Sequence, residues 1–218
     1  MGEGVMKETT MTRRDFLIGA GAVTAGAVTA AAAGRAQAAA TVGQQAPAFS
    51  TTASSGATVK LADYLGKIVV LEWTNHDCPY VRKHYETGNM QALQKEAVGQ
   101  GVIWLTVISS APGEQGHVTA GQANELTLKR EAAPTAVLLD SQGTVGRLYR
   151  ATNTPHMYVV DAQGVLVYAG AIDDRPTTRR ADVQGAKNYV RAALESVVAG
   201  QPVKTPLTRA YGCTVKYA

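Results

Sequence analysis

The chain has 218 residues, of which 45% are hydrophobic, and this is enough for one good-sized domain with an apolar core. The formal net charge is only +4, and the basic residues form no cluster along the sequence. We therefore expect no nucleic-acid partner, because such binding needs basic residues gathered on one surface.

Residues 1–40 differ in composition from the rest of the chain. Arg13-Arg14 precede an apolar run of small residues over 18–33, and Ala36-Gln37-Ala38 has the small-x-small pattern of a cleavage site. This segment resembles a bacterial twin-arginine (Tat) export signal. A membrane anchor is the alternative, but a spanning helix needs about 20 apolar residues. We expect a signal that is cleaved or disordered, the Tat machinery as a partner, and a periplasmic location.

The next part of the chain predicts a lead-in followed by a buried strand. Residues 41–55 are polar and interrupted by Pro and Gly, which suits a lead-in to a first edge strand. Residues 56–61 alternate and predict a short strand, and 61–67 predict a helical turn that ends at glycine. The apolar run over 68–74 predicts a buried strand.

A cysteine lies where this strand ends and a helix begins, in Asn75-His76-Asp77-Cys78-Pro79-Tyr80. Proline is favoured at the first helical position because its missing N–H would have no partner there. A helix N-terminus favours the thiolate form of a cysteine. Cys78 is therefore the hypothesis for the chemical centre. The alternative is an inert, small core residue.

The remaining pattern predicts alternating helices and strands that end in a hairpin and a last helix. This order predicts a parallel core joined by right-handed crossovers, with the hairpin as an antiparallel edge. The expected helices cover 79–86, 90–98 after a break at Thr87-Gly88-Asn89, 120–131, 145–149 and 184–198, and the expected strands cover 102–108, 136–140, 157–161 and 165–170.

Three of these features together resemble the thioredoxin fold. They are a cysteine at a strand-to-helix turn, the Thr154-Pro155 dipeptide that opens a later strand, and the closing hairpin and helix. The resemblance implies an α/β protein with a central mixed β-sheet flanked by helices, an N-terminal extension and a C-terminal tail. It also implies that the Thr154–Pro155 bond is cis and packs beside Cys78.

A narrower resemblance covers residues 42–218. The block 75–85 resembles the Asn-His-x-Cys-Pro-Phe-Val-x-x-His-Tyr block of peroxiredoxin-like redoxin proteins of the alkyl hydroperoxide reductase type, and the segments 170–176 and 211–216 resemble that group as well. The implied organisation is a signal over 1–40 and a redoxin domain over 41–218. The implied activity is thiol-dependent reduction of peroxides or disulfides through Cys78, supported by an unknown thiol reductant and no cofactor.

The sequence also departs from related patterns. Asn75 and Val81 stand where a Cys-x-x-Cys motif would put a second cysteine, so a dithiol cycle inside the turn is impossible. Thr74 lies four residues before Cys78, whereas typical peroxiredoxins have a threonine three residues before the cysteine. The remaining cysteine, Cys213, is a resolving thiol, a structural disulfide partner of Cys78, or a free thiol, and the sequence leaves these open.

The catalytic residues predicted in this way are Cys78, Cys213, Thr154, Pro155 and His76, with His76 as a donor or an ion-pairing cation. His156 follows the expected cis proline and is a further candidate for a position near Cys78.

Other polar residues are expected to play structural or solvent-exposed roles. His84 is expected to be structural, Lys83 to face solvent, and Asp173-Asp174 to lie in a solvated loop.

Two other functions stay open beside the redox assignment. A redox-inactive binding module needs no reactive thiol. A copper or zinc site could form if His76, Cys78 and His156 converge, since thiolate and imidazole suit both metals.

Overall fold

The structure is a computed structural model that describes residues 1–2 and 38–218. The twin-arginine pair and the apolar run that follows it lie outside the described residues. Within the described residues, no helix is both long and apolar enough to cross a membrane.

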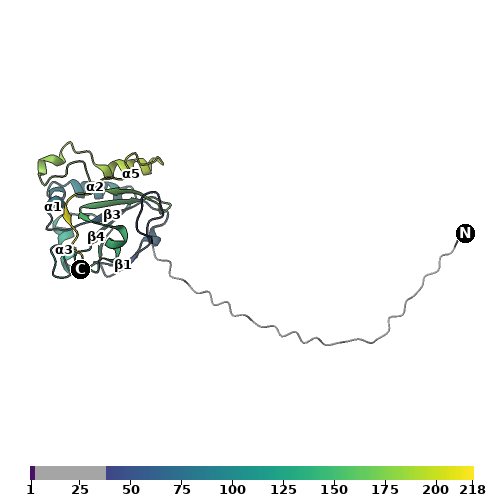
Figure 1. Cartoon of the computed structure of the whole chain (residues 1–218), viewed down its shortest axis with the longest axis horizontal. Coiled ribbons are helices and arrows are strands. Elements are labelled where there is room, and N and C mark those ends of the chain that lie inside the picture. Colours follow the sequence, from purple (N-terminus) through teal and green to yellow (C-terminus); the bar gives the residue numbers. More distant parts are fainter. Residues whose placement is uncertain (3–37) are drawn as a thin grey trace, which may run out of the picture. The chain divides into compact units, whose positions relative to one another are not determined.

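Seven strands of the described part form one mixed sheet with the order β2-β1-β5-β4-β3-β7-β8 (Figure 1). β3, β4 and β5 run parallel, while β1, β2, β7 and β8 pair with their neighbours antiparallel. This is the predicted thioredoxin-like arrangement. The strands are β1 Ser50–Ala53, β2 Thr58–Lys60, β3 Val69–Trp73, β4 Ile103–Ile108, β5 Ala136–Leu139, β7 His156–Val160 and β8 Leu166–Gly170.

Helices cover both faces of this sheet. The predicted order of helices and strands is confirmed, with the hairpin β7–β8 before the last helix. The α-helices are α1 Pro79–Glu86, α2 Asn89–Gly99, α3 Ala120–Lys129, α4 Thr144–Tyr149 and α5 Tyr189–Val198, and the 3-10 helices are η1 Leu61–Tyr64 and η2 Arg180–Val183.

The central strand β3 is buried along its whole length and divides the core in two. Successive side chains of a strand point to opposite faces. Val69, Leu71 and Trp73 therefore join the cluster under η1 and α4, while Val70 joins the cluster under α1, α2 and α5. Figure 1 shows α2 and α5 together on one side of the sheet.

Three local differences from the prediction have simple causes. β1 lies in the polar lead-in and pairs with both β2 and β5, and this short strand of Ser and Thr gave no apolar pattern. The N-cap residue of α2 is Gly88, which has a φ of 74°, and the helix begins at Asn89. We had expected Asn89 itself to be the N-cap residue. α5 begins at Tyr189 rather than 184, because Gly185 has a φ of 75° and Asn188 caps the helix by accepting a hydrogen bond from the Arg191 N–H.

The tail from residue 200 folds back over the domain and adds a short second sheet. β9 (Cys213–Thr214) pairs antiparallel with β6 (Asn153–Thr154), which opens into the strand β7. Val215 is buried in the core cluster that contains Trp73. The tail is therefore a packed part of the domain, and it runs directly across the predicted cis proline.

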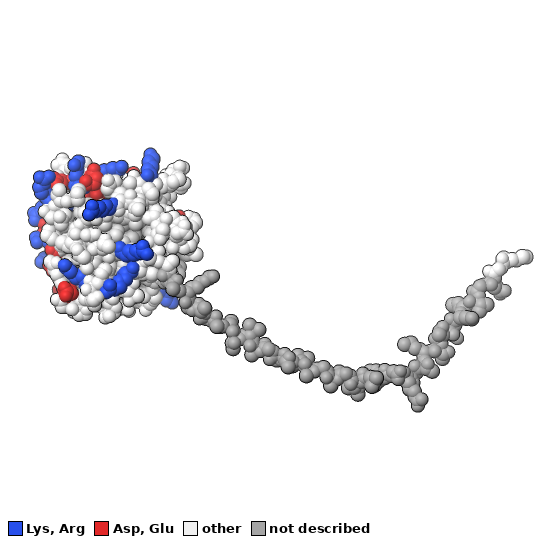
Figure 2. Space-filling view, in the orientation of Figure 1, with Lys and Arg blue, Asp and Glu red and all other residues white. Residues whose placement is uncertain are grey.

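Charged side chains of both signs lie on the surface of the domain. Basic and acidic side chains lie among uncharged ones on the face shown in Figure 2. Several of the surface arginines are paired, for example Arg82 with Glu86 in α1, and Arg180 with the same glutamate.

Candidate functional site

Cys78 lies at the end of the strand-to-helix turn, as predicted. It is the N-cap residue of α1, Pro79 occupies the first turn of the helix, and the Cys78 side chain is fully buried. The Cys78 N–H donates to the carbonyl of Asn75, which closes the turn. The sulfur therefore lies at the positive end of α1, where a negative charge is stabilised.

Asn75 fixes this turn to the loop that follows β4. Its side-chain oxygen accepts a hydrogen bond from the Asp77 N–H at 2.9 Å, and its side-chain nitrogen donates to the Gln115 carbonyl at 3.2 Å. Gly116 lies against the same side chain, and a Cβ atom there would come within 2.3 Å of Asn75 Cγ. Close approach of the two loops therefore requires glycine at position 116. This contact between the loops holds the cysteine turn in place.

The Thr154–Pro155 peptide bond is cis, as the resemblance implied, and it lies beside Cys78. The Cys78 thiol donates to the Thr154 carbonyl, with 3.1 Å between the sulfur and the oxygen. The same carbonyl is approached by Gly212 of the tail, where a Cβ atom would lie 2.0 Å from the Thr154 oxygen. The backbone around the cis proline thus covers one side of the sulfur.

Cys213, the ladder partner of Thr154, also contacts the sulfur. Its backbone N–H donates to Cys78 Sγ, with 3.4 Å between the nitrogen and the sulfur, and the two thiols are free in the structure. Burial, followed by a hydrogen bond and the charge interaction with Cys78, raises the pKa of the Cys213 thiol. The two cysteines, 135 residues apart in sequence, are neighbours at one site.

His76 belongs to the turn, and its closest charged neighbour is Asp77. Its Nε2 lies 3.5 Å from an Asp77 carboxylate oxygen, and its side chain borders a small cavity of about 30 Å³ together with Thr74 and Arg130. Burial lowers the pKa of His76, while the Asp77 carboxylate opposes this. Cys78 is not among the residues that line the cavity.

His156 follows the cis proline but points into the core. Its ring stacks on Tyr158 with 4.5 Å between the centroids, and its Nδ1 accepts a hydrogen bond from the Thr152 N–H at 3.4 Å. Burial lowers its pKa to about 4, so the ring is neutral at neutral pH. In the described part of the chain, no group of three or more His, Cys, Asp or Glu side chains is placed to hold a metal ion.

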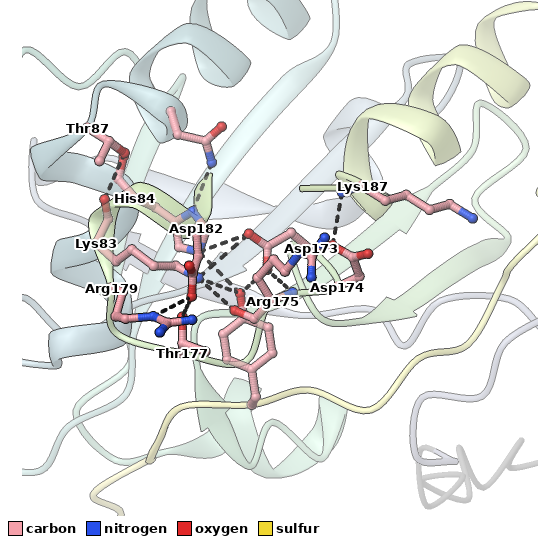
Figure 3. Close-up of polar contacts among 12 residues, drawn as sticks. Lys83, His84, Thr87, Asp173, Asp174, Arg175, Thr177, Arg179, Asp182 and Lys187 are labelled. Atoms are coloured by element: carbon pink, nitrogen blue, oxygen red, sulfur yellow. Dashed lines mark hydrogen bonds and ion pairs between the residues drawn. The ribbon is translucent and has the colours of Figure 1, made fainter. Parts of the chain in front are cut away.

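A buried polar cluster beside the site corrects two expectations. Lys83 and Asp173 were expected to face solvent, but both side chains are almost completely buried, with Lys83 Nζ 3.7 Å from Asp173 Oδ2 (Figure 3). His84 Nε2 lies 3.8 Å from the same oxygen. Tyr211 of the tail donates its hydroxyl hydrogen to Asp173 Oδ1. We call these four residues, Lys83, His84, Asp173 and Tyr211, the Asp173 cluster.

Burial sets the charge states of this cluster. Burial lowers the pKa of Lys83, and the Asp173 carboxylate opposes this change. Burial, followed by repulsion from Lys83, lowers the pKa of His84 to about 3, so this histidine is neutral. Asn89 Nδ2 donates to His84 Nδ1 at 2.8 Å, which places the ring hydrogen on Nε2, facing the Tyr211 hydroxyl and Asp173.

Arg130 is another residue that sequence reasoning missed. It follows α3, packs its guanidinium over the Tyr85 ring at 4.6 Å, and donates to the His76 carbonyl at 2.9 Å. Nothing in its local sequence marks it, because the contact joins residues 54 positions apart. The Asp173 cluster had one signal: its members come from the three segments, 75–85, 170–176 and 211–216, that had suggested the redoxin resemblance.

Comparisons with known proteins agree with the fold and identify the family. The model of the AhpC/TSA family matches residues 42–169. The thioredoxin-like protein YneN of Bacillus subtilis is 28% identical over 144 residues, which cover 65% of this chain and 79% of that protein.

Two solved structures resemble this chain in fold. An uncharacterized conserved protein from Geobacillus kaustophilus superposes with a TM-score of 0.71 at 24% identity, over 82% of this chain and 93% of its own. A hypothetical protein from Sinorhizobium meliloti gives a TM-score of 0.71 at 22% identity, over 84% and 97%. The matched family region ends before Asp173, Tyr211 and Cys213.

Proposed function

Because the chain belongs to the AhpC/TSA family and has a thioredoxin-like fold, we propose that it is a thiol-dependent oxidoreductase with Cys78 as its nucleophile. The substrate is a hydroperoxide or a disulfide. An external thiol compound supplies the electrons.

The observation that carries this proposal is the contact between the two cysteines. The Cys213 N–H donates to Cys78 Sγ, with 3.4 Å between the nitrogen and the sulfur, and both thiols are free. A backbone N–H and a helix N-terminus both favour negative charge on a sulfur atom. The tail thus brings a donor and a second thiol to the only cysteine of the turn.

With a hydroperoxide, the Cys78 thiolate attacks one oxygen and the O–O bond breaks. The alcohol, or water in the case of hydrogen peroxide, leaves, and Cys78 becomes a sulfenic acid. The Cys213 sulfur then attacks the Cys78 sulfur, the S–O bond breaks, and water leaves. A Cys78–Cys213 disulfide is formed, and two equivalents of an external thiol, oxidised to their own disulfide, reduce it to the two thiols.

With a disulfide substrate, the Cys78 thiolate attacks one of its sulfur atoms and displaces the other as a thiolate. Cys213 then attacks the mixed disulfide and releases the second thiol of the substrate. Both routes end in the same Cys78–Cys213 disulfide. In both, Thr154 and the cis Pro155 shape the backbone beside the reacting sulfur, and His76 stays a predicted donor that must turn away from Asp77 to take part.

Peroxide consumption in the presence of dithiothreitol tests the assignment of the nucleophile. Cys78→Ser should reduce the rate to that of the buffer. Cys213→Ser is the matched control, because it keeps the nucleophile and should still consume the first equivalent of peroxide. Consumption by Cys78→Ser at the parental rate would show that Cys78 is not the nucleophile.

The complete burial of Cys78 favours one alternative, a redox-inactive binding module. The same samples separate the two. If the parent protein keeps both thiols after treatment with hydrogen peroxide and, separately, with a small aromatic disulfide, the module replaces the oxidoreductase.

We also propose that the chain is exported to the periplasm through the twin-arginine route. The support is the Arg13-Arg14 pair followed by a run of small apolar residues. Replacing both arginines by lysine keeps the charge and should leave the protein in the cytoplasmic fraction of a Tat-competent host. Equal periplasmic recovery of the variant and the parent would contradict this route.

A further inference from the structure

Tyr211 ties the tail to a buried charge. Its hydroxyl donates to Oδ1 of Asp173, a carboxylate that also accepts the Arg175 N–H at 3.0 Å. Its oxygen lies 3.4 Å from Lys83 Nζ and 3.3 Å from His84 Nε2. One tail hydroxyl therefore touches all three other members of the Asp173 cluster.

The cluster joins three segments that are distant in sequence. Lys83 and His84 come from α1, directly behind the cysteine turn, and Asp173 comes from the loop after β8 (Figure 3). Lys83 Nζ also donates to the Arg175 carbonyl of that loop at 2.8 Å. The loop is thereby fixed to α1, and Tyr211 is held by both.

Burying the charged groups of this cluster costs free energy that a cluster of apolar side chains would not cost. Removing charges from water is expensive, and apolar residues of similar size often serve stability as well or better. Asp173 Oδ2 illustrates the cost, since it accepts no hydrogen bond and lies 3.7 Å from Lys83 Nζ and 3.8 Å from His84 Nε2. Buried polar groups of this kind are best attested where they fix one arrangement among several.

The arrangement fixed here is the position of Cys213. Tyr211 precedes Cys213 by two residues, and between them Gly212 lies against the Thr154 carbonyl. The Tyr211 ring packs near Tyr80 of α1 at 5.8 Å and lies under Lys83 Nζ at 5.3 Å. With Tyr211 in place, β9 pairs with β6 and the Cys213 N–H meets Cys78 Sγ.

We propose that Lys83, His84 and Asp173 are positioning residues that seat Tyr211 and thereby hold Cys213 against Cys78. This rests on the proposed function, in which Cys213 attacks the Cys78 sulfenic acid and releases water. The same contact covers Cys78, whose side chain is fully buried while the tail is closed. The cluster thus sets both how often Cys78 is exposed and how quickly Cys213 returns to it.

Alkylation of Cys78 tests, without any peroxide chemistry, whether the contacts of Tyr211 hold the tail over Cys78. The reduced full-length protein is treated with iodoacetamide, and trypsin then places Cys78 in the peptide 68–82 and Cys213 in the peptide 210–216. Tyr211→Phe keeps the ring and removes only the hydroxyl. We expect labelling of Cys78 to become about tenfold faster or more, because a hydrogen bond to a buried charge is lost.

Tyr217→Phe is the matched control on the other side of Cys213. Its hydroxyl donates to the neutral Ala151 carbonyl at 2.7 Å, and the buried Val215 stands between it and the cysteine. We expect this variant to label within about twofold of the parent, because a bond between neutral groups contributes less than one to a charge. Equal acceleration by both variants, or by neither, would overturn the proposal.

A second readout connects the contacts of Tyr211 to the redox cycle. With excess hydrogen peroxide, Tyr211→Phe should leave Cys78 longer as the sulfenic acid, so that a second peroxide oxidises it to the sulfinic acid. The sulfinic fraction in the peptide 68–82 should exceed those of the parent and of Tyr217→Phe. If alkylation accelerates but no variant is oxidised, the positioning role of the Asp173 cluster is supported and the proposed function is wrong. If oxidation occurs but Tyr211→Phe labels like the parent, only the positioning role of the Asp173 cluster is contradicted.

Discussion

Glu72 and Asp173 are two of the carboxylates that are buried in the described part of the chain, and their surroundings differ. Glu72 of β3 accepts hydrogen bonds from four uncharged side chains: Tyr85, Gln94, Trp104 and Thr106. Asp173 lies in a loop and faces Lys83, His84 and the tail residue Tyr211. The first carboxylate joins strands and helices of the central domain, and the second joins that domain to the tail.

The difference indicates what each carboxylate does. Burial raises the pKa of Glu72, and its four donors oppose this change. These donors come from α1, α2 and β4, which belong to the central sheet and to the helices packed on it. Loss of Glu72 should therefore cost global stability. Loss of the Asp173 contacts should mainly release the tail, because Tyr211 belongs to the tail and can leave Asp173 while the sheet stays intact.

The largest effect on stability is expected from Glu72→Ala. It leaves four buried donors without an acceptor and should lower the free energy of unfolding by about 3–5 kcal/mol. Urea denaturation measures this. Thr106→Val, which removes one donor of the same network, is the control and should cost about 1 kcal/mol. A loss in Glu72→Ala no larger than in the control would show that the four donors do not depend on the Glu72 carboxylate for their stability.

Asp173→Asn should affect the tail before it affects the domain. The amide cannot pair with Lys83 as a carboxylate does, so we expect amide hydrogen exchange of the peptide 210–216 to become about tenfold faster or more. Exchange of the β3 and β4 amides should stay at the parental rate. If both regions accelerate together, the Asp173 cluster is part of the global core and resembles Glu72.

The neutral histidine of the Asp173 cluster predicts a pH effect. His84 has a pKa of about 3 in the folded protein, below its ordinary value of 6.5, so the unfolded chain binds more protons between these values. This contribution to stability is present above pH 6.5 and is lost as the pH falls towards about 3, at about 1.4 kcal/mol per pH unit.

His84→Gln isolates this contribution, because it removes the titrating ring. The free energy of unfolding of the variant should fall less steeply than that of the parent between pH 6 and pH 4. His156, with a pKa of about 4 in the folded protein, should show the same sign in His156→Gln. Parallel curves for the parent and His84→Gln would mean that His84 is charged in the folded protein.

The smallest effect is expected next to Lys83 on the exposed side of α1. Arg82 pairs with Glu86 four residues later, and the Arg82 side chain is 53% exposed. Exposed pairs of this kind contribute about 0.3–0.5 kcal/mol, so Arg82→Ala should change the free energy of unfolding by no more than this. Lys83→Ala should cost several times more, and equal losses would mean that the burial of Lys83 has no energetic weight.

Local patterns predicted the part of the site that lies along the chain. The apolar run before Cys78, Pro79 after it and the break at Gly88 each gave a signal within a few residues, and the structure confirms β3 and the start of α1 at these places. The cis bond at Thr154–Pro155 followed from the resemblance to the thioredoxin fold.

The residues that the sequence did not reveal depend on contacts between distant segments. Lys83 and Asp173 are charged, and charged residues are almost never fully buried unless they are paired, so solvent exposure was the reasonable expectation. Their pairing joins residues 90 positions apart and has no local pattern. The contact of Cys213 with Cys78 likewise depends on the path of the tail, which only the fold determines.

The product of a single oxidation tests most directly whether Cys213 reacts with the oxidised Cys78. The reduced full-length protein is mixed with one equivalent of hydrogen peroxide, alkylated and digested with trypsin. We predict that the peptides 68–82 and 210–216 are recovered joined by a disulfide between Cys78 and Cys213, and that neither carries the alkyl group. Recovery of both peptides in alkylated form, or of an oxidised Cys78 beside an alkylated Cys213, would show that Cys213 does not resolve Cys78.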